Sequence, residues 1–270
     1  MRYIYFLFIL VANFFIAATG TSIAKELEIR FPVIADQSGT SDFYYDLLKT
    51  SLEDEGHSPK ITKLELPQMR IKQYLEDGDI DLFWLVESKE RNEKYLPIEV
   101  GLTQGLIGKR ILLIRKGTQQ DFKNVKSIED FRSLKKVGAF GKNWFDVKVW
   151  KHNNLSYKEQ DGNWKVIYSK LGAGRDFDYF SRGLNEIVAE SKTNNNLEIE
   201  KNLALIYDRD FRFYMPKTKR SSALFPIISA SLKKAQRQGT IDKLVKRHWA
   251  KDFESLDYDN RTKIHLATPK

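Results

Sequence analysis

The chain of 270 residues contains no cysteine. This absence excludes disulfide bonds, thiolate nucleophiles, zinc sites built on cysteine and anchoring by a lipid-modified cysteine. The histidines, His57, His152, His248 and His265, are scattered and form no His-x-x-x-His pair, so we expect no metal site. The sequence also lacks a Gly-x-Ser-x-Gly motif and a P-loop. We therefore expect no cofactor, and we expect that the protein is not an enzyme.

Acidic residues are fewer than basic ones, 36 against 45, which gives a formal net charge of +9. Such a surplus can indicate nucleic-acid binding. Here lysine and arginine alternate with aspartate and glutamate along the whole chain, and no dense basic segment occurs. We therefore expect a basic but ordinary surface and no nucleic-acid partner.

The N-terminus has the pattern of an export signal. A basic start precedes residues 4–18, which are almost wholly apolar, and Ser22-Ile23-Ala24 places small side chains where a signal peptidase cuts. An apolar run of about 15 residues is shorter than the roughly 20 that span a bilayer, which argues against the alternative of a retained membrane anchor. We predict a signal peptide over residues 1–24, cleavage after Ala24, and a protein free in the periplasm.

The first part of the chain alternates between strand and helix patterns. Strands are predicted from apolar side chains at every second position or from short apolar runs, and helices from apolar side chains at helical spacing. The predicted order is strand 27–33, helix 44–52, strand 61–66, helix 71–75 and strand 82–86. This βαβαβ order predicts an open parallel sheet.

A second series of strand and helix patterns begins near residue 109. The predicted elements are strand 109–114, a helix from Ser127, strand 137–140, helices 143–150 and 164–171, strand 178–180, helix 184–191 and strand 210–214. Two amphipathic helices broken at Gly239 follow. Because the alternation starts afresh, we expect an α/β protein with a second lobe.

Four segments of this chain resemble the family 3 extracellular (periplasmic) solute-binding proteins, which have the type II periplasmic binding protein fold. The segments are Gly78-Asp79-Ile80-Asp81, Ser88-Lys89-Glu90-Arg91, residues 127–141 and residues 232–249. They occur in the order and at the distances typical of the family, and the similarity spans nearly all of the chain after residue 24.

The resemblance implies a two-lobed fold with a central mixed or parallel sheet in each lobe and two hinge crossings, near Ile111 and Asp210. Lobe 1 would comprise residues 25–112 plus 211–270, and lobe 2 residues 113–210. The resemblance also implies that a small molecule is captured between the lobes and delivered to an inner-membrane ABC permease. A signalling receptor is the alternative partner. We expect a monomer.

On lobe 1 the resemblance implies that Arg91 holds a ligand carboxylate. A guanidinium can donate two parallel hydrogen bonds to a carboxylate, whereas the alternative is a surface arginine paired with Glu87. Ser88 would donate its hydroxyl to the same anion, or it would cap the helix that leads to Arg91. Phe31 and Tyr44 flank the first loop, and one of them could form an aromatic wall, although burial in the core is favoured.

On lobe 2 the amino-acid-binding members of the family place an aspartate just after a strand, where this chain has Ser181-Arg182-Gly183. This departure argues against an ordinary α-amino acid as ligand. With Arg91 and Arg182 facing one cleft, we expect an anionic or carboxylate-bearing ligand. The alternative is that Arg182 pairs with Glu186 one helical turn later.

Asn143 and Trp144 follow Gly141 at a predicted helix start. Trp144 could stack on a ligand and Asn143 could hydrogen-bond to it, or the two residues could belong to the core and to the helix cap.

Two other functions remain open on the same scaffold. A lyase or dehydratase would use a general acid and a general base in the cleft, and Glu87 and Glu186 are the carboxylates for those roles. A ligand-sensing domain without transport is the other alternative.

Overall fold

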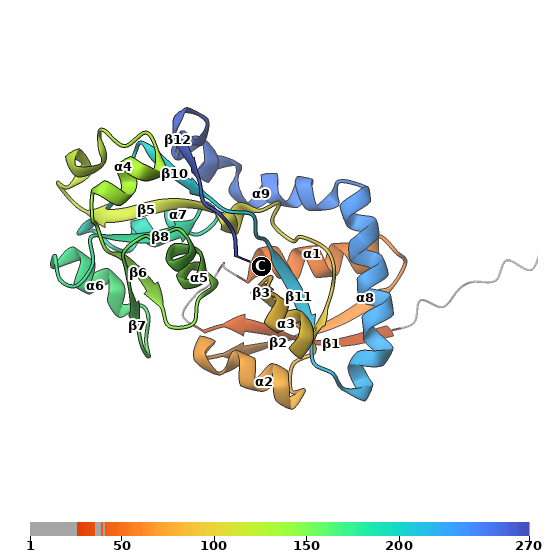
Figure 1. Ribbon diagram of the computed structural model, residues 1–270. Coiled ribbons are helices and arrows are strands. Elements are labelled where there is room, and N and C mark those ends of the chain that lie inside the picture. The colour runs from red at the N-terminus through yellow and green to blue at the C-terminus, as the bar shows by residue number, and fades with distance from the viewer. Residues whose placement is uncertain (1–25, 36–38, 40, 270) are drawn as a thin grey trace, which may run out of the picture.

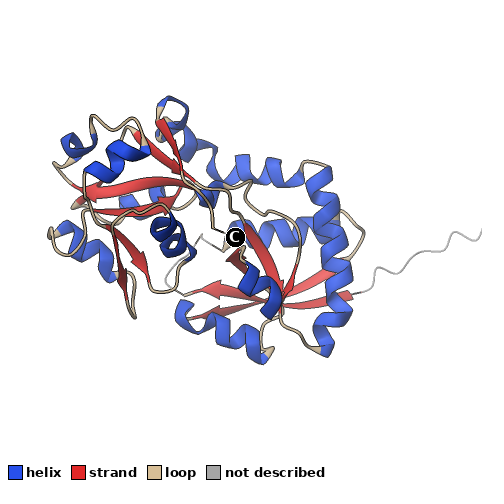
Figure 2. Ribbon diagram, in the orientation of Figure 1, coloured by secondary structure: helices blue, strands red, loops and turns tan. Residues whose placement is uncertain are grey.

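Two lobes, each with a β-sheet and packed helices, make up the computed structural model of the protein (Figures 1 and 2). It describes residues 26–35, 39 and 41–269, so the predicted signal peptide lies outside the described residues. In the described part, no helix has the length and apolar character needed to cross a membrane.

Lobe 1 contains a parallel pair of strands beside an antiparallel trio. The pair is β1 (Glu26–Ile34) and β2 (Ser58–Leu66), and the trio has the order β3 (Phe83–Val86), β11 (Phe211–Met215) and β4 (Leu96–Pro97). Its helices are α1 (Asp42–Glu53), α2 (Ile71–Asp77), α3 (Lys89–Lys94), α8 (Lys219–Arg237) and α9 (Thr240–Ser255).

The segment from Gly78 to Asp81 links the two groups of strands in lobe 1. Gly78 ends α2 with a φ of 76°, a left-handed conformation that glycine adopts without steric cost. The buried carboxylate of Asp81 then accepts hydrogen bonds from the backbone N–H and the guanidinium of Arg30 in β1, both at 2.7 Å. This contact positions β3, which follows Asp81, beside β1.

Lobe 2 contains a mixed sheet in the order β12-β10-β5-β8-β6-β7, with β9 paired to β5. Its strands are β5 (Lys109–Arg115), β6 (Gly138–Gly141), β7 (Tyr157–Gln160), β8 (Tyr179–Gly183), β9 (Leu197–Ile199), β10 (Leu203–Ile206) and β12 (Thr262–His265). Its helices are α4 (Ile128–Ser133), α5 (Phe145–His152), α6 (Val166–Gly172) and α7 (Ile187–Lys192).

The strand pairing moves two parts of the predicted lobe boundaries. The boundary after residue 112 would divide β5, but residues 110–114 of this strand pair continuously with β8. The segment 211–270 was expected in lobe 1, but β12 pairs in parallel with β10 at the edge of the lobe 2 sheet. Because backbone hydrogen bonds define a sheet, we place all of β5 and β12 in lobe 2.

Within the described residues the chain crosses between the lobes three times, before β5, between β10 and β11, and after α9 (Figure 1). The Asp210 carboxylate ties the first crossing to the second, because it accepts hydrogen bonds from the backbone N–H groups of Thr103 (3.1 Å) and Gly105 (3.0 Å). Two crossings were predicted, near Ile111 and Asp210. Ile111 lies inside β5, and the crossing after α9 is additional.

Candidate functional site

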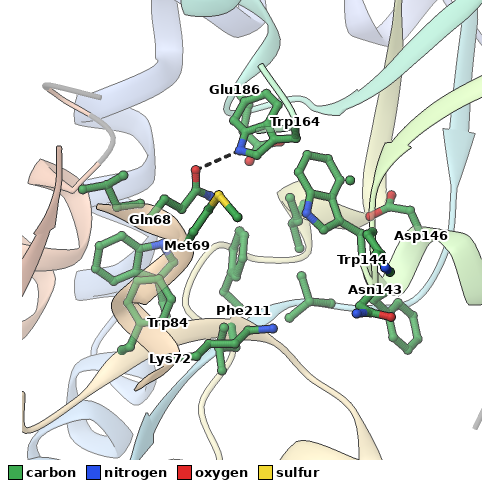
Figure 3. Close-up of a pocket in the computed structure, with 18 of the residues that line it drawn as sticks. Gln68, Met69, Lys72, Trp84, Asn143, Trp144, Asp146, Trp164, Glu186 and Phe211 are labelled. Atoms are coloured by element: carbon green, nitrogen blue, oxygen red, sulfur yellow. Dashed lines mark hydrogen bonds between the residues drawn. The ribbon is translucent and has the colours of Figure 1, made fainter. Parts of the chain in front are cut away.

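A cavity of about 430 Å³ lies between the two lobes (Figure 3). This volume is in the range of small-molecule sites. Both lobes contribute side chains to the lining of the cavity. Those of lobe 1 include Met69, Lys72, Trp84, Arg91 and Phe211. Those of lobe 2 include Arg110, Asn143, Trp144, Asp146, Trp164, Arg182 and Glu186. Lobe 1 therefore contributes cationic and apolar groups, and lobe 2 contributes tryptophans and charged groups of both signs.

Arg91 lines this cavity from α3. Ser88 caps that helix, since its hydroxyl accepts a hydrogen bond from the Arg91 backbone N–H at 3.3 Å, and it does not line the cavity. The expected alternative partner of Arg91, Glu87, instead contacts Arg209 at 3.3 Å. The Arg91 guanidinium donates to the Val86 carbonyl and forms no ion pair with a carboxylate of the described residues. Its charge is therefore available to a ligand.

Lys72 of α2 is a second cation without a carboxylate partner among the described residues, and it also lines the cavity. Partial burial of its ammonium group, and then the positive charge of Arg91, lower the pKa of Lys72 below its ordinary value of 10.5. Burial likewise lowers the pKa of Arg91. Two positive charges on one wall, neither in direct contact with a carboxylate of the described residues, favour an anionic group between them.

The Arg182 guanidinium, in contrast, is already paired. Its Nε and Nη2 donate to the two carboxylate oxygens of Glu190, both at 2.6 Å, and Nη2 lies 3.2 Å from Glu186. Burial alone would lower the pKa of Arg182, but Glu186 and Glu190 outweigh it and hold the pKa above its ordinary value. The expectation of a second free cation at Arg182 is therefore corrected, because two carboxylates neutralise it.

Arg110 of β5 is a second buried guanidinium at the cavity, with an exposed fraction of 1%. It lies 3.0 Å from Asp146 and 3.8 Å from Glu186, and it donates to the Ser181 carbonyl at 2.7 Å. Asp146 also accepts a hydrogen bond from the Tyr207 hydroxyl at 3.0 Å. The charges on the lobe 2 wall thus form an internal network.

Trp144 provides the half-exposed aromatic surface of lobe 2. A Cβ on Gly141 would lie 2.5 Å from the Trp144 ring, so the indole can pack against the end of β6 only because residue 141 is glycine. Asn143 has a φ of 62°, a conformation that asparagine tolerates better than most residues. Its backbone N–H donates to Glu159 at 3.0 Å, and the residue lines the cavity.

Phe31 and Tyr44 lie in the core and do not line the cavity. Their rings stack on Trp84 with centroid distances of 5.7 and 4.2 Å. They support the indole of Trp84, and Trp84 lines the cavity.

Comparisons with known proteins identify the scaffold of this site. No family model and no curated protein matches the sequence. Solved structures do match: a probable amino-acid ABC transporter extracellular-binding protein from Bacillus subtilis has a TM-score of 0.61 at 17% identity, covering 84% of this chain and 100% of that one. The chain has the type II periplasmic binding fold. The α/β, two-lobed prediction is confirmed.

Two further solved structures have this periplasmic binding fold. One is an amino acid ABC transporter substrate-binding protein from Streptococcus pneumoniae bound to L-arginine, with a TM-score of 0.59, 14% identity and coverage of 83% of this chain and 94% of that one. The other is a mutant of ArgBP from T. maritima, with a TM-score of 0.57, 17% identity and coverage of 83% and 95%.

Several lining residues of this periplasmic binding fold were not predicted from the sequence. No sequence pattern distinguishes Lys72, because it is one exposed lysine on a short helix. Trp84 was predicted only as part of a buried strand. Trp164 was assigned to a helix, yet its indole N–H donates to the Gln68 side chain of lobe 1 at 2.9 Å (Figure 3). This bond joins the lobes across the cavity, a contact that no sequence pattern indicates.

The carboxylates considered for an enzymatic role do not lie together in the cavity. Glu87 is not among the lining residues, and Glu186 accepts a hydrogen bond from the Gly183 backbone N–H at 3.0 Å beside Arg182. In the described part of the chain no group of three or more histidine, aspartate or glutamate side chains is arranged to hold a metal ion.

Proposed function

We propose that the protein is a periplasmic solute-binding protein whose lobes close on a small ligand with a carboxylate or other anionic group. The observation that carries this proposal is a pair of cations, Lys72 and Arg91, that line one wall of an inter-lobe cavity of about 430 Å³ and form no ion pair with a carboxylate of the described residues. An anion between them would compensate charges that the protein leaves open, and Arg91 can bind it with two parallel hydrogen bonds.

Closure would follow from contacts that a ligand makes with both lobes at once. A ligand shifts an open–closed equilibrium only by its differential affinity for the two states. Lys72 and Arg91 act from lobe 1 and Trp144 from lobe 2, so a ligand reaches all three only when the lobes approach. The Trp164–Gln68 hydrogen bond adds a direct link between the lobes.

An ABC-type transporter is the partner that the relatives support, since their descriptions name amino acid ABC transporters. A sensory receptor that reads the closed form is the alternative. We infer a binding role rather than catalysis, because Glu87 and Glu186 do not form an acid–base pair in the cavity. Export and a location in the periplasm rest on the predicted signal peptide.

The proposal is tested by thermal melting of the purified protein, expressed from its full-length gene, against amino acids, organic acids, phosphorylated compounds, sugars and polyamines. A ligand that binds only the folded state stabilises it by about 2.7 kcal/mol at a hundredfold excess over its Kd. We expect a rise in Tm with an acid, and loss of that rise in Arg91→Ala.

Two results would contradict the proposal in different ways. Shifts with polyamines or neutral sugars alone would show a solute-binding clamp with the wrong ligand chemistry. No shift with any compound would argue against a solute-binding role altogether.

A further inference from the structure

The cavity is unusually rich in tryptophan. Three of the five tryptophans of the chain, Trp84, Trp144 and Trp164, line it. Trp84 and Trp164 are largely buried, whereas Trp144 and Phe211 are half-exposed and present ring surface to the cavity. The rings come from both lobes, so the aromatic surface surrounds the space rather than forming one side of it (Figure 3).

Met69 supplies a flexible apolar group at the same place. With an exposed fraction of 69%, it is the exposed large hydrophobic side chain of the described residues. It lines the cavity and points into it from the lobe 1 side, opposite Trp144 (Figure 3). A thioether adapts to irregular surfaces and makes favourable contacts with aromatic rings. An exposed methionine at the cavity therefore fits a partner that brings its own apolar surface.

Arg182 fixes the tryptophan wall of lobe 2. Its guanidinium carbon lies 5.1 Å from the ring centroids of both Trp144 and Trp164, and 4.9 Å from that of Phe180. Glu190 holds the guanidinium in place by two hydrogen bonds, as described above. Arg182 is thus a positioning residue, and the wall that it supports is formed before any ligand arrives.

We propose that the ligand is an organic acid with a planar aromatic body. Its acidic group would lie at Lys72 and Arg91, and its ring would lie between Met69 and Trp144. This inference rests on the proposed function and names the ligand class of the same site. A planar ring gains stacking energy on an indole beyond the burial of its area, whereas an aliphatic chain gains the area term alone.

The test compares four compounds of matched design by isothermal titration and by tryptophan fluorescence. Phenylacetate carries ring and charge, cyclohexylacetate a saturated ring and the same charge, acetate the charge alone, and 2-phenylethanol the ring alone. We expect phenylacetate to bind about tenfold more tightly than cyclohexylacetate, with a change in fluorescence, and the remaining two compounds to bind more weakly still.

Three variants show where the preference arises. Trp144→Leu should remove the preference for phenylacetate over cyclohexylacetate, and Met69→Ala should weaken phenylacetate binding without lowering Tm, because Met69 is exposed. Trp249→Leu is the matched control, since Trp249 is half-buried in α9 against Phe43 and does not line the cavity. It should leave the preference unchanged.

The outcomes separate this inference from the proposed function. Equal binding of cyclohexylacetate and phenylacetate, or an unchanged preference in Trp144→Leu, overturns the aromatic ligand class and leaves the clamp for anionic solutes in place. The same holds if none of the four compounds binds and the broader melting set identifies an acid without an aromatic ring. If the broader set also yields no ligand, the proposed function fails with it.

Discussion

The two walls of the cavity hold their cations in opposite ways. On lobe 1, Lys72 and Arg91 have no carboxylate partner among the described residues. On lobe 2, Arg110 and Arg182 are buried and contact carboxylates at 3.0 and 2.6 Å. The charges have the same sign and share one cavity, but only those of lobe 1 are left for a ligand. The arginines of lobe 2 therefore stabilise the fold through ion pairs, whereas the cations of lobe 1 can bind an anionic ligand.

The largest expected effect tests the paired side of this comparison. Arg182→Met should lower the free energy of unfolding by about 3–5 kcal/mol, because Glu186 and Glu190 would remain near one another without the charge that neutralises them. Urea denaturation measures this loss. Arg91→Met is the matched control, and it should cost no more than about 1 kcal/mol, the value of one hydrogen bond. Equal losses of unfolding free energy in Arg182→Met and Arg91→Met would show that the ion pairs of Arg182 add no stability beyond what Arg91 contributes.

A smaller effect tests the unpaired side. Lys72→Met should raise the free energy of unfolding at neutral pH by less than about 1 kcal/mol, since the Lys72 side chain is only partly buried and solvent screens its charge. The pKa of Lys72 is lowered in the fold, so the unfolded chain binds more protons between that pKa and 10.5. The charged Lys72 therefore destabilises the folded protein fully at pH values below its lowered pKa. This destabilisation disappears as the pH rises from the lowered pKa toward 10.5.

Urea denaturation of the wild type and of Lys72→Met at pH 7 and pH 10 measures this effect. The difference in free energy of unfolding between the two proteins should be smaller at pH 10. A Lys72→Met variant that is less stable than the wild type at pH 7 would mean that Lys72 has a stabilising partner after all.

The smallest effect concerns an ion pair outside the cavity that also joins the lobes. Lys148 of α5 lies 3.3 Å from Glu90 of α3, and the side chains are 57% and 77% exposed. A double-mutant cycle with alanine should give a coupling energy of about 0.5 kcal/mol that vanishes in 1 M salt. If the pair supports closure, the coupling appears in ligand affinity as well.

The pair Lys49–Glu53 within α1, at 3.6 Å, is the control for that cycle because it does not join the lobes. Its coupling should appear in stability and not in ligand affinity. If Lys49–Glu53 and Lys148–Glu90 showed the same coupling energy in ligand affinity, the proposal that Lys148–Glu90 supports closure of the lobes would be wrong.

The α/β alternation was predictable because most strands and helices have strong local patterns. β1 shows period-two alternation, and α8 and α9 have long apolar faces broken at Gly239. β9, β10 and β12 were not predicted, because each has only three or four residues, too few to show a clear strand pattern. Their positions depend on pairing with β5 and with one another, which is tertiary information.

Residues of the candidate site could be predicted where a short sequence motif identifies them. They could not be predicted where their role depends on which charged side chains they contact in the fold. The segment from Ser88 to Arg91 drew attention to an arginine that the structure places in the lining of the cavity, because a short motif fixes its position after β3. The pairing of Arg182 with Glu186 was foreseen as an alternative, because the two residues are four apart. Its shorter contact, with Glu190, was not foreseen, since Glu190 is eight residues away and reaches Arg182 only through the turn between β8 and α7. Lys72 is indistinguishable in the sequence from the other exposed lysines.

The position of β12 has a consequence for how the protein is made. β12 follows every other strand of the lobe 2 sheet in the sequence, so it is synthesised after all of them. Until it arrives, β10 presents unpaired N–H and C=O groups along one side, which is the kind of edge that recruits foreign strands. A chain that stops before residue 262 would keep that edge of β10 exposed, so we expect it to aggregate more readily than a chain that includes β12.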